Sequence, residues 1–287
     1  MVGFLSLNEL GEAEREGRTS FCTFRKVPSQ ASTANGWVDY SMAGGNPVPN
    51  FYAASPFEAS FLDPFKGVFH GDDKAPYSKH LAKLLVVTPT AAMLGPVTLL
   101  DYLMFYPFID GDAAGEIQTL TNPSAMPLTR STDGLGVRVM AIVSAPTTGG
   151  GSFRYYYDDA NGVAQVSPII NVNTAITNIA SCLTGDPNSA SNGAPFLPMG
   201  GDGNGVRRIT DVEVITPIGG LFSLVLVNAL GSTVMREVNT PYELEYVTMK
   251  PGLPRVFDGA FLNFIGNPAG SVAGGIFTGN AHFAWSK

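Results

Sequence analysis

The sequence is poor in charge. Charged residues make up 14% of its 287 residues, against roughly 25% in a typical soluble domain. Acidic residues outnumber basic ones, the formal net charge is −7, and no run of Lys or Arg occurs. Because nucleic-acid binding relies on Lys and Arg to displace counterions, we expect no direct contact with nucleic acid. So little charge is typical of a protein that hides surface in an assembly, and also of an ordinary Ser/Thr/Asn-rich β-protein surface.

The sequence also has no long hydrophobic run. Its longest apolar stretch, Val97–Ile109, carries Asp101 and Pro107 and is too short to span a bilayer. The N-terminal residues lack the basic region and apolar core of a signal peptide. We therefore expect no contact with a membrane.

Residues that carry catalysis are scarce. The two cysteines, Cys22 and Cys182, fit a reducing compartment or two buried thiols and cannot make a disulfide scaffold. A Gly-x-Ser-x-Gly nucleophile motif is absent, because Ser271 lacks both outer glycines. The three histidines are His70, His80 and His282. The sequence therefore predicts no enzyme and no catalytic residue.

Acidic residues recur in short loops. The pairs are Asp72 and Asp73, Asp110 and Asp112, Asp158 and Asp159, and Asp202 with Asn204. Such pairs could serve a glycosidase or bind Ca²⁺, but none has the twelve-residue calcium-loop pattern with its terminal Glu. Asp and Asn also favour turns without any ligand. We therefore predict no metal and no cofactor, and leave calcium at these turns as the alternative.

Glycine and proline, by contrast, are abundant. The chain has 33 Gly and 21 Pro, which favours many short strands and turns over long helices. About ten strand-like segments alternate with turns and long loops. We therefore predict an all-β fold: a β-sandwich or jelly-roll-like body over residues 51–287, with few short helices.

One strand–turn–strand unit occurs twice. Residues 133–162 and 202–231 match without a gap at an offset of 69, with 12 identities in 30 positions. Many of the shared residues are glycines, so the match indicates either an internal duplication or two unrelated Gly-rich hairpins. In either case the sequence predicts hairpin turns at Pro146–Gly151 and Pro217–Gly220 between antiparallel strands.

Residues 1–50 differ in composition from the rest. Ser6 and Glu9 have capping-box spacing, which predicts a short helix that ends at Gly17. Ser20–Pro28 alternates like a strand, and Ser29–Asn50 is small, polar and interrupted by Gly and Pro. We therefore expect residues 18–50 to form an extended arm that becomes ordered only in an assembly. The candidate interface residues on this arm are Phe21, Phe24, Trp37 and Tyr40.

Four further segments give local predictions. Ser78–Leu85 favours one or two helical turns, and Val97–Ile109 favours a central strand with Pro107 near an end or an edge. Gly259–Ile265 and Ala281–Trp285 indicate the closing strands. Phe51–Phe69 is dense in aromatics without a regular period, which indicates a loop with aromatic packing.

Several long runs resemble virion structural proteins of tailed bacteriophages. They are Ser20–Pro28, Lys66–Leu84, Leu99–Asp112, Leu128–Val143 and Gly259–Ser286. The resemblance spans most of the chain, but these runs are not chemical motifs and assign no catalytic residue. It implies a capsid or capsid-associated role, most like that of a capsid decoration (cement) protein.

From the resemblance we expect a protein made in the host cytoplasm that bridges capsomers on the outer capsid surface. The expected partner is the major capsid protein, and the expected assembly is a homotrimer. A major capsid, tail, collar or adaptor protein is the alternative within the class. A long spine helix, expected of a major shell protein, is not indicated by the sequence. A carbohydrate- or receptor-binding module is the alternative from another class.

Overall fold

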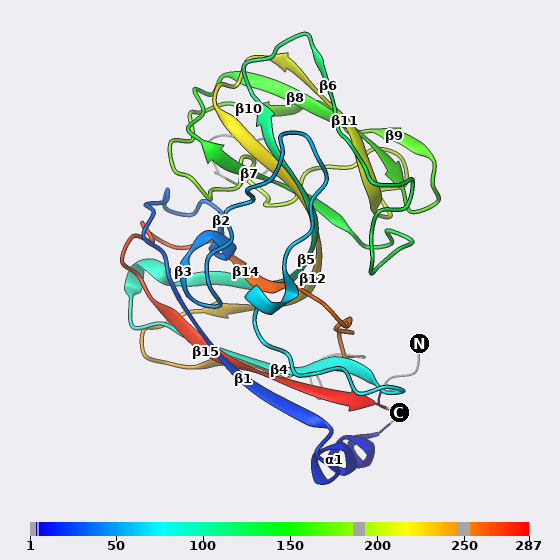
Figure 1. The fold of residues 1–287 in the computed structure, drawn as a ribbon. Helices are drawn as coiled ribbons and strands as arrows, with labels where there is room; N and C mark the ends of the chain where they lie inside the picture. Colours follow the sequence, from blue (N-terminus) through cyan, green and yellow to red (C-terminus); the bar gives the residue numbers. More distant parts are fainter. Residues whose placement is uncertain (1–3, 5, 186–192, 246–252, 287) are drawn as a thin grey trace.

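The computed structural model describes residue 4 and residues 6–185, 193–245 and 253–286. Its described part consists mainly of antiparallel strands in three sheets, which confirms the predicted all-β fold (Figure 1). The lower sheet has the order β13 (Tyr242–Glu245), β4 (Ser78–Val87), β15 (Phe277–Ser286), β1 (Thr19–Val27), β3 (Gly44–Asn46). The central sheet has the order β2 (Val38–Asp39), β14 (Leu262–Gly266), β5 (Gly95–Asp110), β12 (Leu221–Met235), β7 (Arg138–Ala145). The upper sheet has the order β10 (Ile170–Val172), β8 (Gly151–Asp159), β11 (Val206–Thr216), β6 (Ile117–Thr119), with β9 (Ala164–Val166) also paired to β8.

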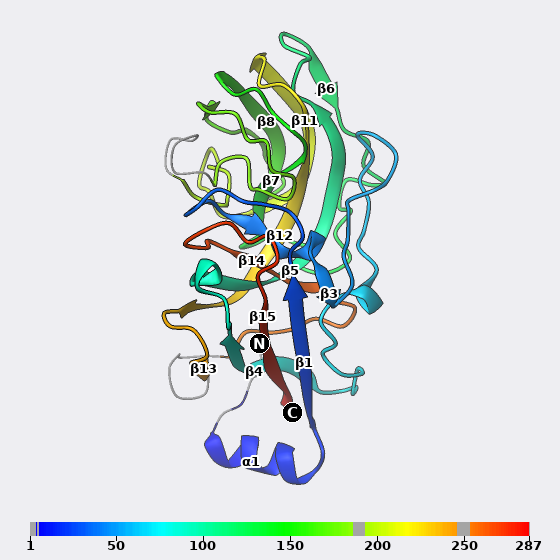
Figure 2. The same ribbon diagram turned by 90° about the vertical axis from the view of Figure 1, so that its left-hand side faces the viewer.

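The central sheet is buried on both faces. Along β7, Met140 and Ile142 face the core shared with the lower sheet, while Val139, Ala141 and Val143 face the core shared with the upper sheet. This is the period-two alternation of a strand with an apolar layer on each side. The body is therefore a three-layer arrangement with two cores that share one sheet (Figure 2).

Strand β5 is the central strand that the sequence indicates. It pairs with β14 and with β12, and most of its residues are buried. Pro107 lies near the strand's end, where the register with β12 shifts and Phe108 has a φ of 59°. The missing amide of the proline therefore falls at a bulge, as proline in a sheet requires.

The repeated unit is present, but its two copies are not hairpins. In the first copy, β7 lies in the central sheet and β8 in the upper sheet. In the second copy the order is reversed, with β11 in the upper sheet and β12 in the central sheet. Strand β7 pairs with β12 and β8 with β11, so each copy's first strand lies beside the other copy's second. A two-fold relation between the copies gives this exchange of partners. The hairpin prediction is therefore wrong, and the turns instead connect two sheets.

The two turns also contact each other. The amides of Thr148 and Gly149 donate to the carbonyl oxygen of Ile218 at 2.9 and 3.1 Å. Gly220 has a φ of 66°, and a Cβ there would lie 2.1 Å from the carbonyl oxygen of Pro146. The glycines shared by the copies thus allow the close approach of the two turns.

The first 50 residues are part of the body, which corrects the prediction of a separate arm. The predicted helix is confirmed as α1 (Leu7–Arg15), with the Ser6 hydroxyl accepting from the Glu9 amide and Gly17 at a φ of 68°. Strand β1 then lies inside the lower sheet between β15 and β3, and β2 pairs with β14 in the central sheet. Alternate apolar residues of β1 supply the burial that composition alone did not reveal.

The remaining local predictions have mixed outcomes. The closing strands are confirmed as β14 and β15. Ser78–Leu85 is not helical but belongs to β4, between β13 and β15. The other described helices are single 3₁₀ turns, η1 (Tyr40–Met42), η2 (Pro64–Lys66) and η3 (Ala91–Met93).

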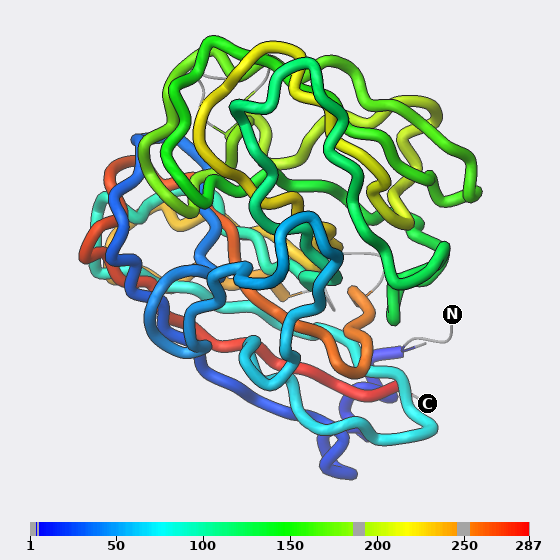
Figure 3. Tube along the Cα trace, turned by 45° about the horizontal axis from the view of Figure 1, so that its top comes forward, coloured from blue at the N-terminus to red at the C-terminus, as the bar shows by residue number. Residues whose placement is uncertain are grey.

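The aromatic segment 51–69 follows the side of the sheets. Ser60 and Phe105 exchange two backbone hydrogen bonds beyond the end of β14, and the Val68 amide donates to Leu262 on β14 itself. In Figure 3 this blue-to-cyan segment winds over the molecule between its lower and upper parts. The segment covers edges of the central sheet that would otherwise be unpaired.

Candidate functional site

A fully buried lysine organises the most polar region of the lower sheet. The Lys79 ammonium donates to His70 Nδ1 at 2.9 Å, the Gly71 carbonyl at 3.0 Å and Asp73 Oδ1 at 3.0 Å. An ammonium has three protons, so these three acceptors use all of them. Lys79 therefore holds loop 70–73 against β4 and is not free to act as a nucleophile.

His70 is fixed on both sides of its ring. Its Nε2 lies 3.0 Å from the Ala260 carbonyl and donates to it, which leaves Nδ1 as the acceptor for Lys79. Burial, followed by the charge of Lys79, lowers the pKa of His70 to about 4. The imidazole is thus neutral at physiological pH and serves as a structural bridge.

Two carboxylates, Asp73 and Asp258, lie on the exposed side of the cluster formed by Lys79 and His70. Asp258 Oδ1 lies 3.7 Å from the Lys79 ammonium, and Asp73 and Asp258 are hydrogen-bonded to each other. Burial raises the pKa of Asp258, and the neighbouring Asp73 raises it further. Burial also acts to raise the pKa of Asp73, but hydrogen bonds from Asp258 and Lys79 outweigh it and lower that pKa. Asp258 is therefore the group of the pair that takes up a proton first.

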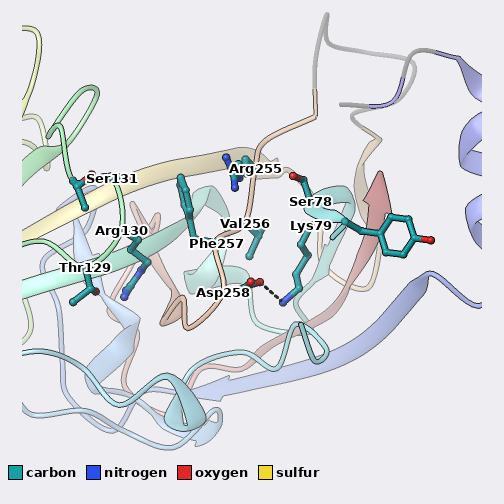
Figure 4. A pocket seen from close by; sticks show the side chains of 11 residues that line it. Ser78, Lys79, Thr129, Arg130, Ser131, Arg255, Val256, Phe257 and Asp258 are labelled. Atoms are coloured by element: carbon teal, nitrogen blue, oxygen red, sulfur yellow. Dashed lines mark ion pairs between the residues drawn. The ribbon is translucent and has the colours of Figure 1, made fainter. Parts of the chain in front are cut away.

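A hollow of about 330 Å³ lies on one side of this cluster (Figure 4). Segments 77–79, 129–132 and 255–258 line it, and Figure 4 shows Lys79 reaching toward Asp258 across its floor. Arg130 is engaged by Asp101 at 2.8 Å and by the Tyr102 carbonyl at 2.7 Å. Lys79, Asp258 and Arg130 thus already have charged partners, whereas the exposed Arg255 guanidinium lies over the Phe257 ring, 4.6 Å from its centre.

A second hollow of about 340 Å³ lies over loop 64–73. Its lining is Pro64, Phe65, Gly67, Phe69, His70, Gly71, Asp72, Asp73 and Gly259. Phe65 is 95% exposed and Phe69 is 63% exposed. We call this hollow the Phe65–Phe69 groove.

Local structure explains why these two rings face solvent. Asp63 caps η2 by accepting from the Phe65 amide at 3.1 Å, and Pro64 starts the turn. The chain then runs extended along β14, so Val68 and His70 face inward and Phe69, between them, faces outward. The outward rings therefore follow from backbone geometry that the core fixes.

His80 and Ser286 form a serine–histidine pair that the sequence did not reveal. His80 Nε2 lies 3.1 Å from Ser286 Oγ, and His80 Nδ1 faces the Leu253 carbonyl at 3.3 Å. Ser286 is fully buried, so no substrate can reach its hydroxyl. Catalysis would also use a carboxylate to orient the base, and the position is taken by a backbone carbonyl.

The acidic turns have structural roles. Asp110 accepts from the Asp112 amide at 2.9 Å, and Asp159 accepts from the amides of Asn161 and Val163 at 2.8 and 2.9 Å. These are the side-chain turns that Asp forms without a metal. Within the described residues no group of three or more His, Cys, Asp or Glu is placed to hold a metal ion.

The four candidate interface residues lie in different environments. Phe24 and Tyr40 are buried in the lower core and cannot act as exposed anchors, which corrects that part of the prediction. Trp37 is half-buried beneath Gly185, where its amide donates to the Gly185 carbonyl. Phe21 remains 62% exposed on β1, so it alone of the four is free to make a large apolar contact.

Next to them, Asp39 forms a polar centre within the lower core. It is 1% exposed and accepts from the hydroxyls of Tyr52, Tyr102 and Ser41 at 2.5, 2.7 and 2.7 Å. Burial raises the pKa of Asp39, and these hydrogen bonds oppose the rise. Burial lowers the pKa of the nearby Lys26 to about 8, and the charge of Asp39 offsets part of that change. Asp39 thus links β2 to Tyr102 on β5, and to Ser41 and Tyr52 in the segment that follows β2.

Comparisons with known proteins identify no relative. No protein-family model, no curated protein and no solved structure matches the chain. In the described part of the chain, no helix has the length and apolar character needed to cross a membrane. The function is therefore argued from the residues and the geometry.

Proposed function

We propose that the chain is a structural protein of a tailed-bacteriophage virion and that it decorates and stabilises the capsid. The sequence runs that resemble such virion proteins support this proposal. A non-enzymatic role agrees with the chemistry of the buried polar groups, because Lys79, His70 and Asp39 are each held by several fixed partners.

The observation that carries the proposal is a concentration of exposed apolar side chains in one segment. Within residues 48–69 the large exposed apolar side chains are Val48, Phe51, Phe61, Phe65 and Phe69. Single exposed apolar residues are ordinary, whereas several in one region mark a surface that another molecule covers. Backbone hydrogen bonds hold this segment to β5 at Ser60 and to β14 at Val68, so its exposed rings require no arm to be presented.

In this proposal the three-layer body is a rigid block that bridges neighbouring capsomers. A homotrimer at a local three-fold position of the shell would meet three capsomer boundaries at once. The net charge of −7 disfavours contact with packaged DNA and favours the outer capsid surface. The partner is then the major capsid protein, and synthesis takes place in the host cytoplasm.

The test compares particles with and without the chain. We expect particles that lack it to assemble but to release DNA at a lower temperature, and added purified protein to restore the release temperature. An unchanged release temperature at full occupancy would contradict a stabilising role. Deletion of residues 1–50 is not a suitable variant, because it removes β1 from the interior of the lower sheet.

Other virion positions and a carbohydrate-binding module remain the alternatives. For the latter, Tyr156 is the one residue of the Tyr155–Tyr157 run outside the core, and the Arg154 guanidinium lies 5.4 Å from its ring centre. The ring is therefore already partly covered by a neighbour. Saturable binding to a glycan array by the isolated protein would favour the module over the capsid role.

A further inference from the structure

We propose that the Phe65–Phe69 groove binds an arginine side chain presented by a protein partner. This inference deepens the proposed function, because it names the chemistry of one partner contact. It rests on that function only where it takes the partner to be the capsid shell.

The lining of the groove combines aromatic surface with negative charge. Phe65 and Phe69 supply two largely exposed rings, and Asp72 and Asp73 supply two carboxylates. No Lys or Arg is among the residues that line the groove. A planar cation fits this combination, because it stacks on aromatic faces and pairs with carboxylates.

Asp72 is the carboxylate that is free to bind the cation. It is exposed, and within the described part of the chain it makes neither a side-chain hydrogen bond nor an ion pair. Asp73 is already held by Lys79 at 3.0 Å but keeps 52% of its side chain exposed. Asp72 can thus form a direct pair with a cation, whereas the charge of Asp73 is already paired with that of Lys79.

Lys79 is the cation nearest the groove and is already paired with Asp73, but the two other nearby lysines do not neutralise Asp72. Lys66 is on the same turn as Phe65 but pairs with Asp63 at 3.8 Å. Lys74 turns away, since its ammonium donates to the Gly17 carbonyl and lies 5.0 Å from the Trp285 ring centre. The negative charge at Asp72 is therefore available to a ligand.

The charges also exclude an apolar occupant. A leucine or phenylalanine in the groove would remove water from Asp72 without giving its carboxylate a partner, and that desolvation is unfavourable. An arginine keeps the apolar contact along its stem and supplies the missing donors at its head. A volume of about 340 Å³ lies at the small end of the range for ligand pockets, which suits one long side chain.

The backbone of the groove is closely packed before binding. A Cβ on Gly67 would lie 2.8 Å from the Leu262 amide nitrogen, so the loop backbone lies directly on β14. Gly71 has a φ of 79°, and a Cβ there would meet Trp285 and Ser20 within 3 Å. A pre-formed site loses little entropy when its ligand binds.

The test is an amide-shift NMR titration of the full-length protein with N-acetyl-arginine amide. The matched ligand is N-acetyl-citrulline amide, which has the same shape without the charge. We expect saturable shifts confined to Phe65–Asp73 and Gly259, with a Kd on the order of millimolar. Citrulline should bind about fivefold more weakly, since an exposed charge interaction is worth up to about that factor.

Variants assign the binding to the groove. Phe65→Ala and Asp72→Asn should each weaken arginine binding about threefold or more while leaving the fold intact, because both side chains are exposed. Phe51→Ala removes another exposed ring outside the groove lining and should leave the titration unchanged. Equal binding of citrulline, tighter binding of leucine amide, binding of lysine amide as tight as that of arginine amide, or no saturable shift would each overturn the proposal.

Occupancy of virions separates this inference from the proposed function. If the unmodified chain occupies particles and Asp72→Asn lowers its occupancy, both proposals are supported. If Asp72→Asn occupies particles as fully as the unmodified chain, the groove is not the capsid contact although the virion role remains. If the unmodified chain is absent from particles, the virion role fails, and the titration alone decides whether the groove binds arginine.

Discussion

His70 should make the stability of this protein sensitive to mild acid. In the folded chain its ring bridges Lys79 and the Ala260 carbonyl, and its pKa is lowered to about 4 from the ordinary 6.5. Between these two values the unfolded chain binds a proton that the folded chain does not. The stability due to neutral His70 is therefore complete above pH 6.5 and is lost as the pH falls toward 4.

The two pKa values set the size of the effect. From pH 7.5 to pH 4.5, linkage with pKa values of about 4 and 6.5 gives a loss of about 2–3 kcal/mol from His70. The replacement His70→Gln keeps groups that can accept from Lys79 and donate to Ala260, but it does not titrate. The variant should therefore lose less stability than the unmodified protein over this interval.

The assay is urea unfolding of both proteins at pH 7.5 and pH 4.5. Contributions from distant carboxylates occur in both proteins and cancel in the comparison, so the remaining difference reports on His70 together with Asp73, which shares Lys79 with it. Burial also lowers the pKa of His80, so His80→Gln should remove a separate part of the acid sensitivity. An identical pH dependence for the unmodified protein and His70→Gln would refute the assignment of His70 as a buried neutral bridge.

Three further substitutions test the packing. Tyr52→Phe removes one donor to the buried carboxylate of Asp39 and should cost about 1–3 kcal/mol of unfolding free energy by urea titration. Phe222→Ala empties a fully buried position in the upper core and should cost about 3–5 kcal/mol, and a loss below 1 kcal/mol would show that the core there is not tightly packed. Gly205→Ala should lower Tm far more than Gly115→Ala, because a Cβ at Gly205 would lie 2.0 Å from a backbone oxygen while the space at Gly115 is open; equal shifts would contradict the contact between the repeated units.

Local sequence signals predicted the elements whose structure depends mainly on their own residues. The capping pattern at Ser6 predicted α1, and the apolar run at Val97–Ile109 predicted the central strand β5. Ser78–Leu85 failed because its Leu, Ala and Lys residues favour a helix in isolation. In the folded chain, pairing with β13 and β15 and the burial of Lys79 override that preference.

The connectivity of the repeats could not be read from local pattern. A Gly-rich turn between two alternating segments has the same sequence signature whether the strands pair with each other or enter different sheets. Phe153 and Phe222 occupy matching positions in the two copies, and they pack in the upper core with ring centres 5.1 Å apart. Which strand lies beside which is a long-range property, and it appears only in the pairing of β7 with β12 and of β8 with β11.

Part of the candidate site was visible in the sequence. The aromatic density of Phe51–Phe69 and the pair Asp72 and Asp73 were both noted, but nothing indicated that they form one groove. Asp258 is far away in the sequence and reaches the cluster only because segment 255–258 lies beside β4. Because we expected an arm, we placed the candidate interface residues in residues 18–50. The strand-like alternation of Ser20–Pro28 in that range could have indicated that Phe24 is buried.

The most direct measurement of the central claim is a cryo-EM map of purified particles of the phage that encodes this chain. The virion proposal predicts density for the three-layer body on the outer capsid surface, as trimers repeated at local three-fold positions, with segment 48–69 against the shell. Density for the chain confined to the tail or collar would contradict the decoration role. Absence of the chain from the particle altogether would contradict the virion role.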